Sequence, residues 1–590
     1  MKKYIILSTI SAALVFTSCD DLFEPAIENN LGIEYMYEDA SYAEGVLGNA
    51  YTRIPCSSFS FNEVATDDAV SNYSSNDYRL MAEGAWTSDN NPMDQWTACK
   101  AAIMYINLFL DNADLVDWAD DEIAAQMYCD REKGEAYGLR AMYNYYLLMA
   151  HGGYTDDGEL LGVPIVDYPE ETDTEFNIPR NTYAECMQAI YDDCELALDL
   201  LPTFYEDISS SSEIPSKYAE IGGTTAKYNR VFGSGFNGRM CGAIVEAFRA
   251  KAALMAASPA YNEDSGVTWD DAADYAAIVL DRIGGIDGMD PTGWTWFSNT
   301  TEINTLADGA NPDEVLWRGE KSSGSDWESE NYPPSLYGSG RVNPSQNFVD
   351  AFPMANGYPI TEEESGYDAN DPYTDRDPRL AEFVVYNGSA VGVNDTEIIT
   401  AVDGTTQDAL NYVSGSSTRT GYYLRKPLRQ DVNLDPTSTT SQYHYTPYIR
   451  YTEIFLAYAE AANEAWGPTS TGGHDYSAYD VIKAIRSRAG VGGDEDPYLE
   501  SIKDDQDKMR ELIHNERRIE LSFEGHRFWD LRRWQESITE TVQGMSITSA
   551  TNTYSVIDVY TPAYKDYMYY GPIPYSEVLK FDQLIQNKGW

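Results

Sequence analysis

Apolar residues recur at helical spacing through both ends of the chain, and this periodicity limits the fold more than any other feature. Between residues 130 and 150, for example, Leu139, Tyr143 and Leu147 fall on one face of a helix. Small residues such as Ala457 and Ala461 would let a neighbouring helix approach closely, as in stacked TPR-like helix pairs. The chain is therefore expected to be mainly α. Besides 130–150, the pattern predicts helices at about 93–116, 182–200, 243–257, 270–281, 449–465, 478–488, 508–523 and 528–536.

The middle of the chain, residues 284–448, differs in amino-acid composition and lacks the helical periodicity. Gly, Pro, Ser, Asn and Asp interrupt it constantly, with aromatic residues between them. Short alternating pieces such as Phe383–Tyr386 could form small strands. We expect a loop-rich insertion in a helical scaffold, and loops on a rigid scaffold are where binding residues tend to lie.

Charge excludes one class of function. Among 590 residues, 40 Lys and Arg stand against 96 Asp and Glu, which leaves a formal net charge of −56. Nucleic-acid binding needs a basic footprint, so it is excluded here. The 46 Tyr, 18 Phe and 12 Trp, beside many short polar residues, suit the binding of polar, ring-shaped ligands.

The start of the chain has the pattern of a targeting signal that is cleaved off. Lys2 and Lys3 precede a short apolar run that is too short to span a bilayer as a mature helix, so residues 1–18 are predicted to be a signal peptide. The small residue before Cys19 resembles a bacterial lipobox, which implies that Cys19 is acylated. The alternative is an ordinary signal peptide with an incidental cysteine. No later stretch is long and apolar enough for a membrane helix.

Signals of catalysis or metal binding are weak. Gly233, Gly235 and Gly238 match GxGxxG, but their flanks are not those of a βαβ unit. No HExxH, no GxSxG and no metal-spaced His or Cys cluster is present, so neither metal nor cofactor is expected. The cysteines beyond Cys19 are expected to be mostly buried and free; they are Cys56, Cys99, Cys129, Cys186, Cys194 and Cys241.

One C-terminal motif is specific. Residues 516–534 read Glu-Arg-Arg-Ile-Glu-Leu-Ser-Phe-Glu-Gly-His-Arg-Phe-Trp-Asp-Leu-Arg-Arg-Trp, which resembles the C-terminal signature of SusD/RagB proteins. Lys588 departs from the family pattern, which usually has proline there. Further matches occur in the expected order at 134–141, 152–153, 163–164, 377–379, 448–453, 458–461 and 586–590.

The resemblance covers nearly the whole mature chain and carries several implications. It implies a right-handed superhelix of TPR-like helix pairs within one domain, residues 19–590, with a scaffold at about 35–283 and 449–590 and a loop-rich insertion at about 284–448. It also implies oligosaccharide capture at the outer surface of a Bacteroidetes-like cell, where Asp20 and Asp21 resemble the export signal of such lipoproteins. A SusC-like, TonB-dependent outer-membrane transporter is the implied partner.

The resemblance places the ligand among N-terminal loops and the insertion. Any of the aromatic candidates could instead pack in the core, and Trp317 is expected to do so. Peptide binding by the same fold is an alternative, and a surface hydrolase is a weaker one. The residues in comparable stretches are Arg79, Trp86, Trp96, Trp294, Trp296, Trp327, Tyr332 and Tyr337.

The charges of the C-terminal signature are interpreted as structural. Many are spaced three or four residues apart, and arginine forks can satisfy carboxylates between packed helices. Glu520 and Glu524 could be proposed as a catalytic pair, but arginines lower the pKa of a carboxyl group, whereas a general acid needs a raised one.

Overall fold

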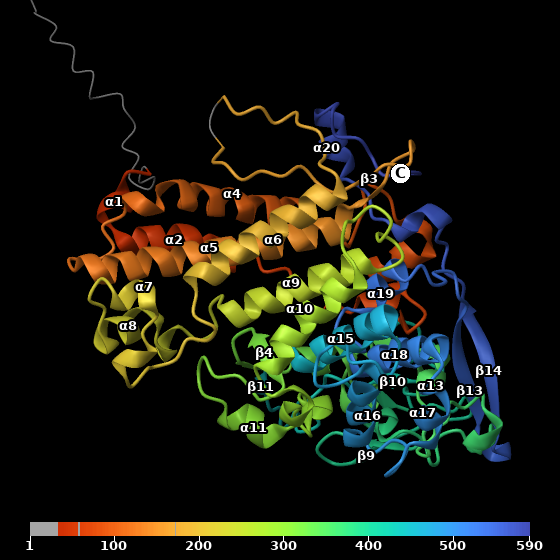
Figure 1. Ribbon diagram of the computed structural model, residues 1–590. Helices are drawn as coiled ribbons and strands as arrows, with labels where there is room; N and C mark the ends of the chain where they lie inside the picture. The colour runs from red at the N-terminus through yellow and green to blue at the C-terminus, as the bar shows by residue number, and fades with distance from the viewer. Residues whose placement is uncertain (1–32, 57–59, 171–172) are drawn as a thin grey trace, which may run out of the picture.

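The computed structural model describes residues 33–56, 60–170 and 173–590 (Figure 1). The expected signal peptide and Cys19 lie outside these described residues. The mainly helical fold expected from the sequence is confirmed, with short strands scattered as pairs. No helix in the described part of the chain is both long and apolar enough to cross a membrane.

The scaffold is a series of helices in which each packs on the next (Figure 1). α15 ends the series and also packs on α16 (Ala478–Arg488) and α18 (Gln506–Glu520). In order, the series is α2 (Ala40–Tyr51), α4 (Trp96–Asn112), α5 (Glu122–His151), α6 (Tyr183–Leu200), α9 (Gly242–Ala257), α10 (Trp269–Asp281) and α15 (Tyr451–Trp466).

Local sequence explains how these helices begin, end and pack. The Asp121 side chain caps α5 by accepting a hydrogen bond from the Ala124 N–H. Gly152 follows α5, and a Cβ there would lie 2.6 Å from the Leu148 carbonyl oxygen. All but one residue of α9 are buried, because its many alanines let neighbouring helices approach closely.

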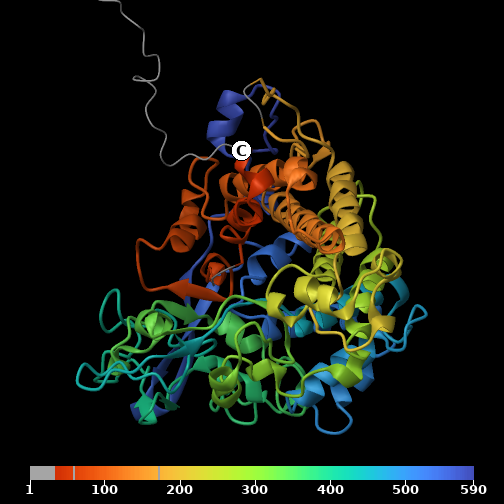
Figure 2. The same ribbon diagram turned by 90° about the vertical axis from the view of Figure 1, so that its left-hand side faces the viewer.

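Strand pairing closes the base of the insertion. β4 (Val315–Arg318) pairs antiparallel with β12 (Pro447–Arg450), so residues near the two ends of the insertion lie side by side. β1 (Ala69–Ser71) pairs with β6 (Val342–Pro344), with Val70 opposite Asn343, which joins the N-terminal segment to the insertion. In Figure 2 the N-terminal helices lie above the green and blue-green insertion.

The insertion consists of short elements around a hydrophobic core that includes Phe348 and Phe383 and that also takes in Val64, Ile519 and Met545 from outside the insertion. Its helices are α11 (Thr300–Thr305), α12 (Asp326–Asn331), α13 (Gln346–Ala351) and α14 (Pro378–Phe383), and its other strands are β5 (Ser322–Gly324), β7 (Val384–Val385), β8 (Ser389–Val391), β9 (Thr396–Ile398), β10 (Tyr423–Leu424) and β11 (Gln442–His444). β5 pairs with β11, β7 with β10, and β8 with β9.

A C-terminal hairpin, β13 (Val542–Thr548) with β14 (Thr553–Tyr560), was not expected from the sequence. The Met545 N–H donates to the Thr420 carbonyl at 2.7 Å, which fastens β13 to the insertion. The remaining short elements are α1 (Tyr35–Glu38), α3 (Asp77–Leu80), α7 (Ser216–Ala219), α8 (Thr225–Phe232), α17 (Pro497–Ile502), α19 (Arg527–Arg533), α20 (Tyr575–Lys580), β2 (Gly153–Tyr154) and β3 (Leu160–Leu161).

The six cysteines that the structure describes are free thiols. Five are buried and Cys56 is partly exposed, as expected from the sequence. Cys186 and Cys194 lie on α6, two turns apart.

Candidate functional site

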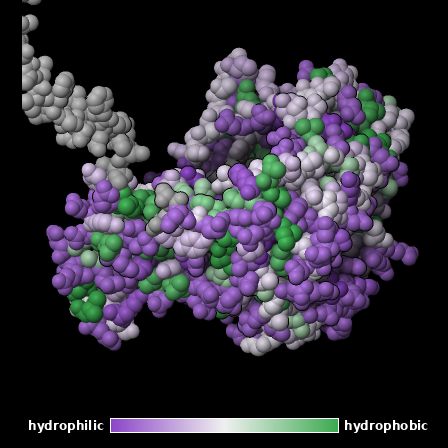
Figure 3. Space-filling model, turned by 90° about the horizontal axis from the view of Figure 1, so that it is seen from above, coloured by the Kyte–Doolittle hydropathy of each residue, from purple (hydrophilic) through white to green (hydrophobic). Residues whose placement is uncertain are grey.

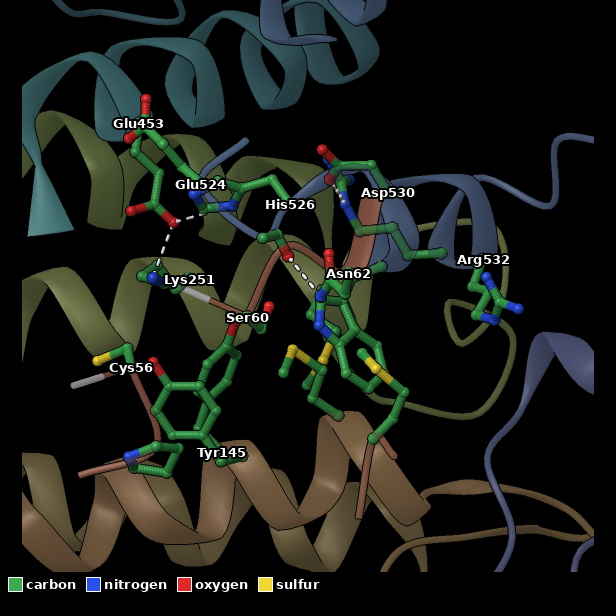
Figure 4. Close-up of a pocket in the computed structure, with 18 of the residues that line it drawn as sticks. Cys56, Ser60, Asn62, Tyr145, Lys251, Glu453, Glu524, His526, Asp530 and Arg532 are labelled. Carbon is green, nitrogen blue, oxygen red and sulfur yellow. Dashed lines mark hydrogen bonds and ion pairs between the residues drawn. The ribbon is translucent and has the colours of Figure 1, made fainter. Parts of the chain in front are cut away.

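An open cavity lies where the helical scaffold meets the turn between α18 and α19, and we call it the central cavity (Figure 4). It holds about 180 Å³, far more than the roughly 10–15 Å³ that one water molecule needs. Its walls come from α5, α9, the start of α15, this turn, and N-terminal segments before α4. The side chains that line it include Asn62, Tyr145, Lys251, Tyr448, Glu453 and His526.

An ion pair between two helices lines this cavity. Lys251 of α9 and Glu453 of α15 are both buried, and Nζ lies 2.8 Å from Oε1 (Figure 4). Burial is the largest single influence and raises the pKa of Glu453, but the ammonium of Lys251 and the other neighbouring groups together outweigh it and hold that pKa below its usual range. The pair is therefore charged and offers a fixed donor and acceptor to a polar ligand.

The turn between α18 and α19 forms another wall. Gly525 has φ +86°, a conformation that favours glycine, and its carbonyl accepts a hydrogen bond from Asn62 Nδ2 at 3.3 Å. The next residue, His526, lies 3.9 Å from Glu453. Burial lowers the pKa of His526 to about 4, so its ring is neutral at neutral pH.

Aromatic rings supply much of the remaining wall. Tyr145 and Tyr146 of α5 lie edge to face, with ring centroids 5.1 Å apart. Tyr448 of β12 is held edge to face against the buried Trp317 at 4.9 Å. Such rings present flat, apolar surfaces of defined orientation beside the polar groups.

A second cavity, of about 200 Å³, adjoins the first, and we call it the Trp327 cavity. Thr446 and Tyr448 line both cavities. Trp327 of α12 lies edge to face with His444 at 4.8 Å, and His444 Nε2 is 2.9 Å from Glu328 Oε1. Trp327 therefore lines one of two cavities that share a wall, and the ion-paired Lys251 lines the other.

The charged residues of the C-terminal signature form the hydrogen-bonded network that the sequence predicted. Glu524 accepts from Arg450 at 2.7 Å and from Lys426 at 2.7 Å; both cations are buried, and the Glu524 side chain is only 6% exposed. Burial opposes ionisation of Glu524, but these two cations lower its pKa to about 2. The pKa of Glu520 is lowered as well, because Arg488, Arg379, Arg450 and Lys426 together outweigh burial. Neither carboxyl group is poised to donate a proton.

Four of the expected ligand-binding aromatics are packed in the core, namely Trp86, Trp96, Trp296 and Tyr332. Trp86 donates to Asn91 and contacts Phe528, Tyr564 and Trp590 edge-on. Trp296 is buried against Phe297 and Tyr445, and Tyr332 is buried with its hydroxyl on the Arg429 carbonyl. Trp317 is buried, as expected.

The buried Trp96 also lines a third cavity, of about 220 Å³, beside α20. Seen from above, the surface is mostly hydrophilic, with scattered apolar patches and a hollow (Figure 3). Trp294 is partly buried against Phe383, and Tyr337 is exposed. Arg79 is partly buried and paired with Glu83. Of the eight expected residues, only Trp327 lines either of the two adjoining cavities.

Sequence reasoning missed Tyr145, Lys251, Tyr448, Glu453 and His526 as cavity residues. One signal was present: Lys251, like Glu246 and Arg249, is a charged residue in a helix made mostly of small and apolar residues, and buried charges need partners. Tyr448, Glu453 and His526 belong to the motifs that carry the family resemblance, which point to the family and not to a cavity. Among the described residues, no group of three or more His, Cys, Asp or Glu could hold a metal ion.

Two family models match the chain. Residues 308–590 match the model described as "SusD family", and residues 39–223 match the model described as "Starch-binding associating with outer membrane". A curated relative, SusD-like protein P2 of Formosa agariphila, is 38% identical over 94 residues, which are 16% of this chain and 17% of that protein. The match thus spans less than a fifth of that relative's length.

Solved structures share the fold along nearly the whole chain. A SusD-like protein of Bacteroides fragilis has a TM-score of 0.69 at 22% identity and covers 94% of this chain and 98% of its own. A SusD-like carbohydrate-binding protein of the same species has a TM-score of 0.67 at 22% identity, covering 93% and 99%. A laminarin-binding SusD-like protein has a TM-score of 0.54 at 19% identity, covering 94% and 100%. The resemblance seen in the C-terminal signature is confirmed.

Proposed function

Because the chain belongs to the SusD family, we propose that it binds an oligosaccharide, without cleaving it, in the central cavity and the adjoining Trp327 cavity. The observation that carries the proposal is the placement of Trp327 and Tyr448 beside fixed polar groups. Sugar rings have apolar C–H faces and hydroxyl rims. Aromatic rings therefore stack on the faces, while Lys251, Glu453 and Asn62 bond the hydroxyl groups.

The comparisons support a carbohydrate as the ligand. One matching family model is described as starch-binding, and two structures with the same fold bind carbohydrate or laminarin. A binding role without catalysis is supported by the ionised state of Glu520 and Glu524. Neither can supply the protonated carboxylic acid that glycoside hydrolysis requires.

This function requires the protein to lie at the cell surface. Residues 1–18 are removed, the acylated Cys19 anchors one domain, residues 19–590, to the outer membrane, and the domain faces the exterior. A SusC-like, TonB-dependent transporter receives the captured ligand. Purification of the native complex in mild detergent is expected to recover that transporter. Repeated recovery of this chain alone would contradict the partnership.

Affinity electrophoresis of the soluble chain lacking residues 1–19, through gels cast with different polysaccharides, tests the binding site. Retardation is expected in at least one gel, and Trp327→Ala is expected to lose most of it. Trp269→Ala, which replaces a partly exposed tryptophan on α10 that lines neither cavity, is the matched control. Equal retardation of Trp327→Ala and the parent would remove the Trp327 cavity from the proposal. Retardation by no polysaccharide, with binding of peptides instead, would overturn it.

A further inference from the structure

Two arginines from distant parts of the chain converge on one backbone carbonyl. Arg79 of α3 and Arg419 of the insertion each donate through Nη1 to the Ser71 carbonyl oxygen, both at 3.3 Å. Since both nitrogen atoms reach the same oxygen, they lie at most about twice that distance apart. Two positive charges are thus held close together at the end of β1.

The carboxylates around this pair do not balance it. Glu83 pairs with Arg79 at 2.8 Å, and Arg419 has no carboxylate within ion-pairing distance among the described residues. Burial, and after it the positive charge of Arg79, lower the pKa of Arg419. Two guanidinium groups held this close repel each other, and partial burial removes water that would screen them, so an anion bound between them would be stabilised.

A third arginine and an exposed ring extend the cluster. The guanidinium of Arg341 lies over the ring of Tyr73, 4.8 Å from its centroid, and Tyr73 is 47% exposed. Both flank the β1–β6 pair, because the Asn72 N–H donates to the Arg341 carbonyl at 3.2 Å. Glu330 is the carboxylate partner of Arg341, at 3.2 Å. We call Arg79, Arg341, Arg419 and Tyr73 the arginine patch.

We propose that the arginine patch binds the acidic groups of the oligosaccharide, so that the ligand of this chain is an anionic glycan carrying carboxylate or sulfate groups. This inference rests on the proposed function. Guanidinium groups match the planar, paired oxygens of carboxylates and the oxygens of sulfate esters through two parallel hydrogen bonds. The Tyr73 ring offers a face on which an adjacent sugar stacks. Since the rest of the chain repels anions, a local basic patch is needed for such a ligand.

The test compares matched pairs of polysaccharides in the same gels: polygalacturonate against neutral galactan for carboxylate, and carrageenan against agarose for sulfate. Stronger retardation by an acidic member is expected, weakening as NaCl is raised. The first comparison tests recognition of carboxylate groups, and the second tests recognition of sulfate groups. The double variant Arg79→Gln/Arg419→Gln is expected to lose at least tenfold in affinity for the acidic member and little for the neutral one.

Lys217→Gln/Arg230→Gln, which removes two exposed positive charges of α7 and α8, is the charge-matched control. If the double variant fails to fold, Tyr73→Ala and the conservative Arg419→Lys are tested instead. Tyr73→Ala is expected to lose affinity for the acidic polysaccharide, and Arg419→Lys is expected to retain part of it. Retardation by neutral members alone, or equal loss in the control and the double variant, would overturn the inference and leave the proposed function standing. Retardation by no polysaccharide would overturn both.

Discussion

At the scale of residues, the molecule depends on buried charges that satisfy one another. Arg450 is buried and reaches both Glu524 and Glu314 across the start of α15. Arg379 reaches Asp377, Glu516 and Glu520. A buried ion pair adds little net stability over an apolar pair. Removing one member, however, leaves the charge of the other unpaired in a medium of low polarity, which is strongly destabilising.

Replacing Glu524 with alanine is therefore expected to destabilise the chain by about 3–5 kcal/mol, because Arg450 and Lys426 lose a shared carboxylate. Urea unfolding followed by circular dichroism measures this loss. Glu577→Ala, which removes an ion pair at the surface of α20, is the control and should cost under about 1 kcal/mol. Similar losses in the two variants would show that the network is not required for stability.

Glu63 makes stability depend on pH. Its Oε1 accepts from the Gly525 N–H at 2.8 Å, while Oε2 has no hydrogen-bond partner among the described residues. Burial raises the pKa of Glu63 to about 7, above the unfolded value near 4.3. A raised folded pKa contributes stability that is present at acid pH and is lost as pH rises through about 7, at roughly 1.4 kcal/mol per pKa unit.

Glu63→Gln removes that titration, since the amide oxygen can still accept from Gly525 and no charge is buried. The variant is expected to match the parent near pH 4 and to melt at a higher temperature than the parent at pH 8. Thermal unfolding at a series of pH values measures the difference. A difference that does not change with pH would contradict the assigned state of Glu63.

At the scale of elements, the sequence predicted the scaffold helices well and the late hairpin not at all. The pattern placed a helix at 478–488, and α16 spans Ala478–Arg488. Helical periodicity is local, so it can be seen in one stretch of sequence. β13 and β14 bury only part of their residues, and β13 packs on Thr420, more than a hundred residues earlier, so no local pattern marks them.

The contact between β13 and the insertion is tight at one glycine. A Cβ on Gly544 would lie 2.7 Å from the backbone Cα and O of Thr420, neither of which can rotate away. Gly544→Ala is expected to destabilise the chain by about 1–3 kcal/mol. In contrast, Gly48→Ala in α2 meets nothing within 4 Å and should stabilise it by about 0.5–1 kcal/mol. Urea unfolding of both variants checks the pair, and a neutral Gly544→Ala would show that the hairpin is not pressed against the insertion.

At the scale of the whole molecule, the proposed site exists only where distant segments meet. Tyr145, Lys251 and His526 come from two scaffold helices and the turn after α18, while Trp327 comes from the insertion. Composition indicated a ring-binding protein, but it could not separate Trp327, which lines a cavity, from Trp86 and Trp296, which are core. The difference is set by tertiary packing, which the local sequence does not carry.

The net charge of the whole molecule also affects which charge its ligand can carry. A net charge of −56 repels anions from most of the surface, so the arginine patch beside β1 and β6 would act as a local exception. The two cavities and this patch then divide recognition, with aromatic stacking in one place and charge pairing in the other.

Glycan binding without cleavage is tested most directly by calorimetric titration of the soluble chain with an oligosaccharide cut from a polysaccharide that retards it, followed by chromatography of the recovered sugar. Saturable binding is expected, with the sugar recovered at its original length, and Trp327→Ala is expected to bind at least tenfold more weakly with its unfolding temperature unchanged. Shortened sugar would show a hydrolase, and undiminished binding by Trp327→Ala would place the ligand outside the adjoining cavities.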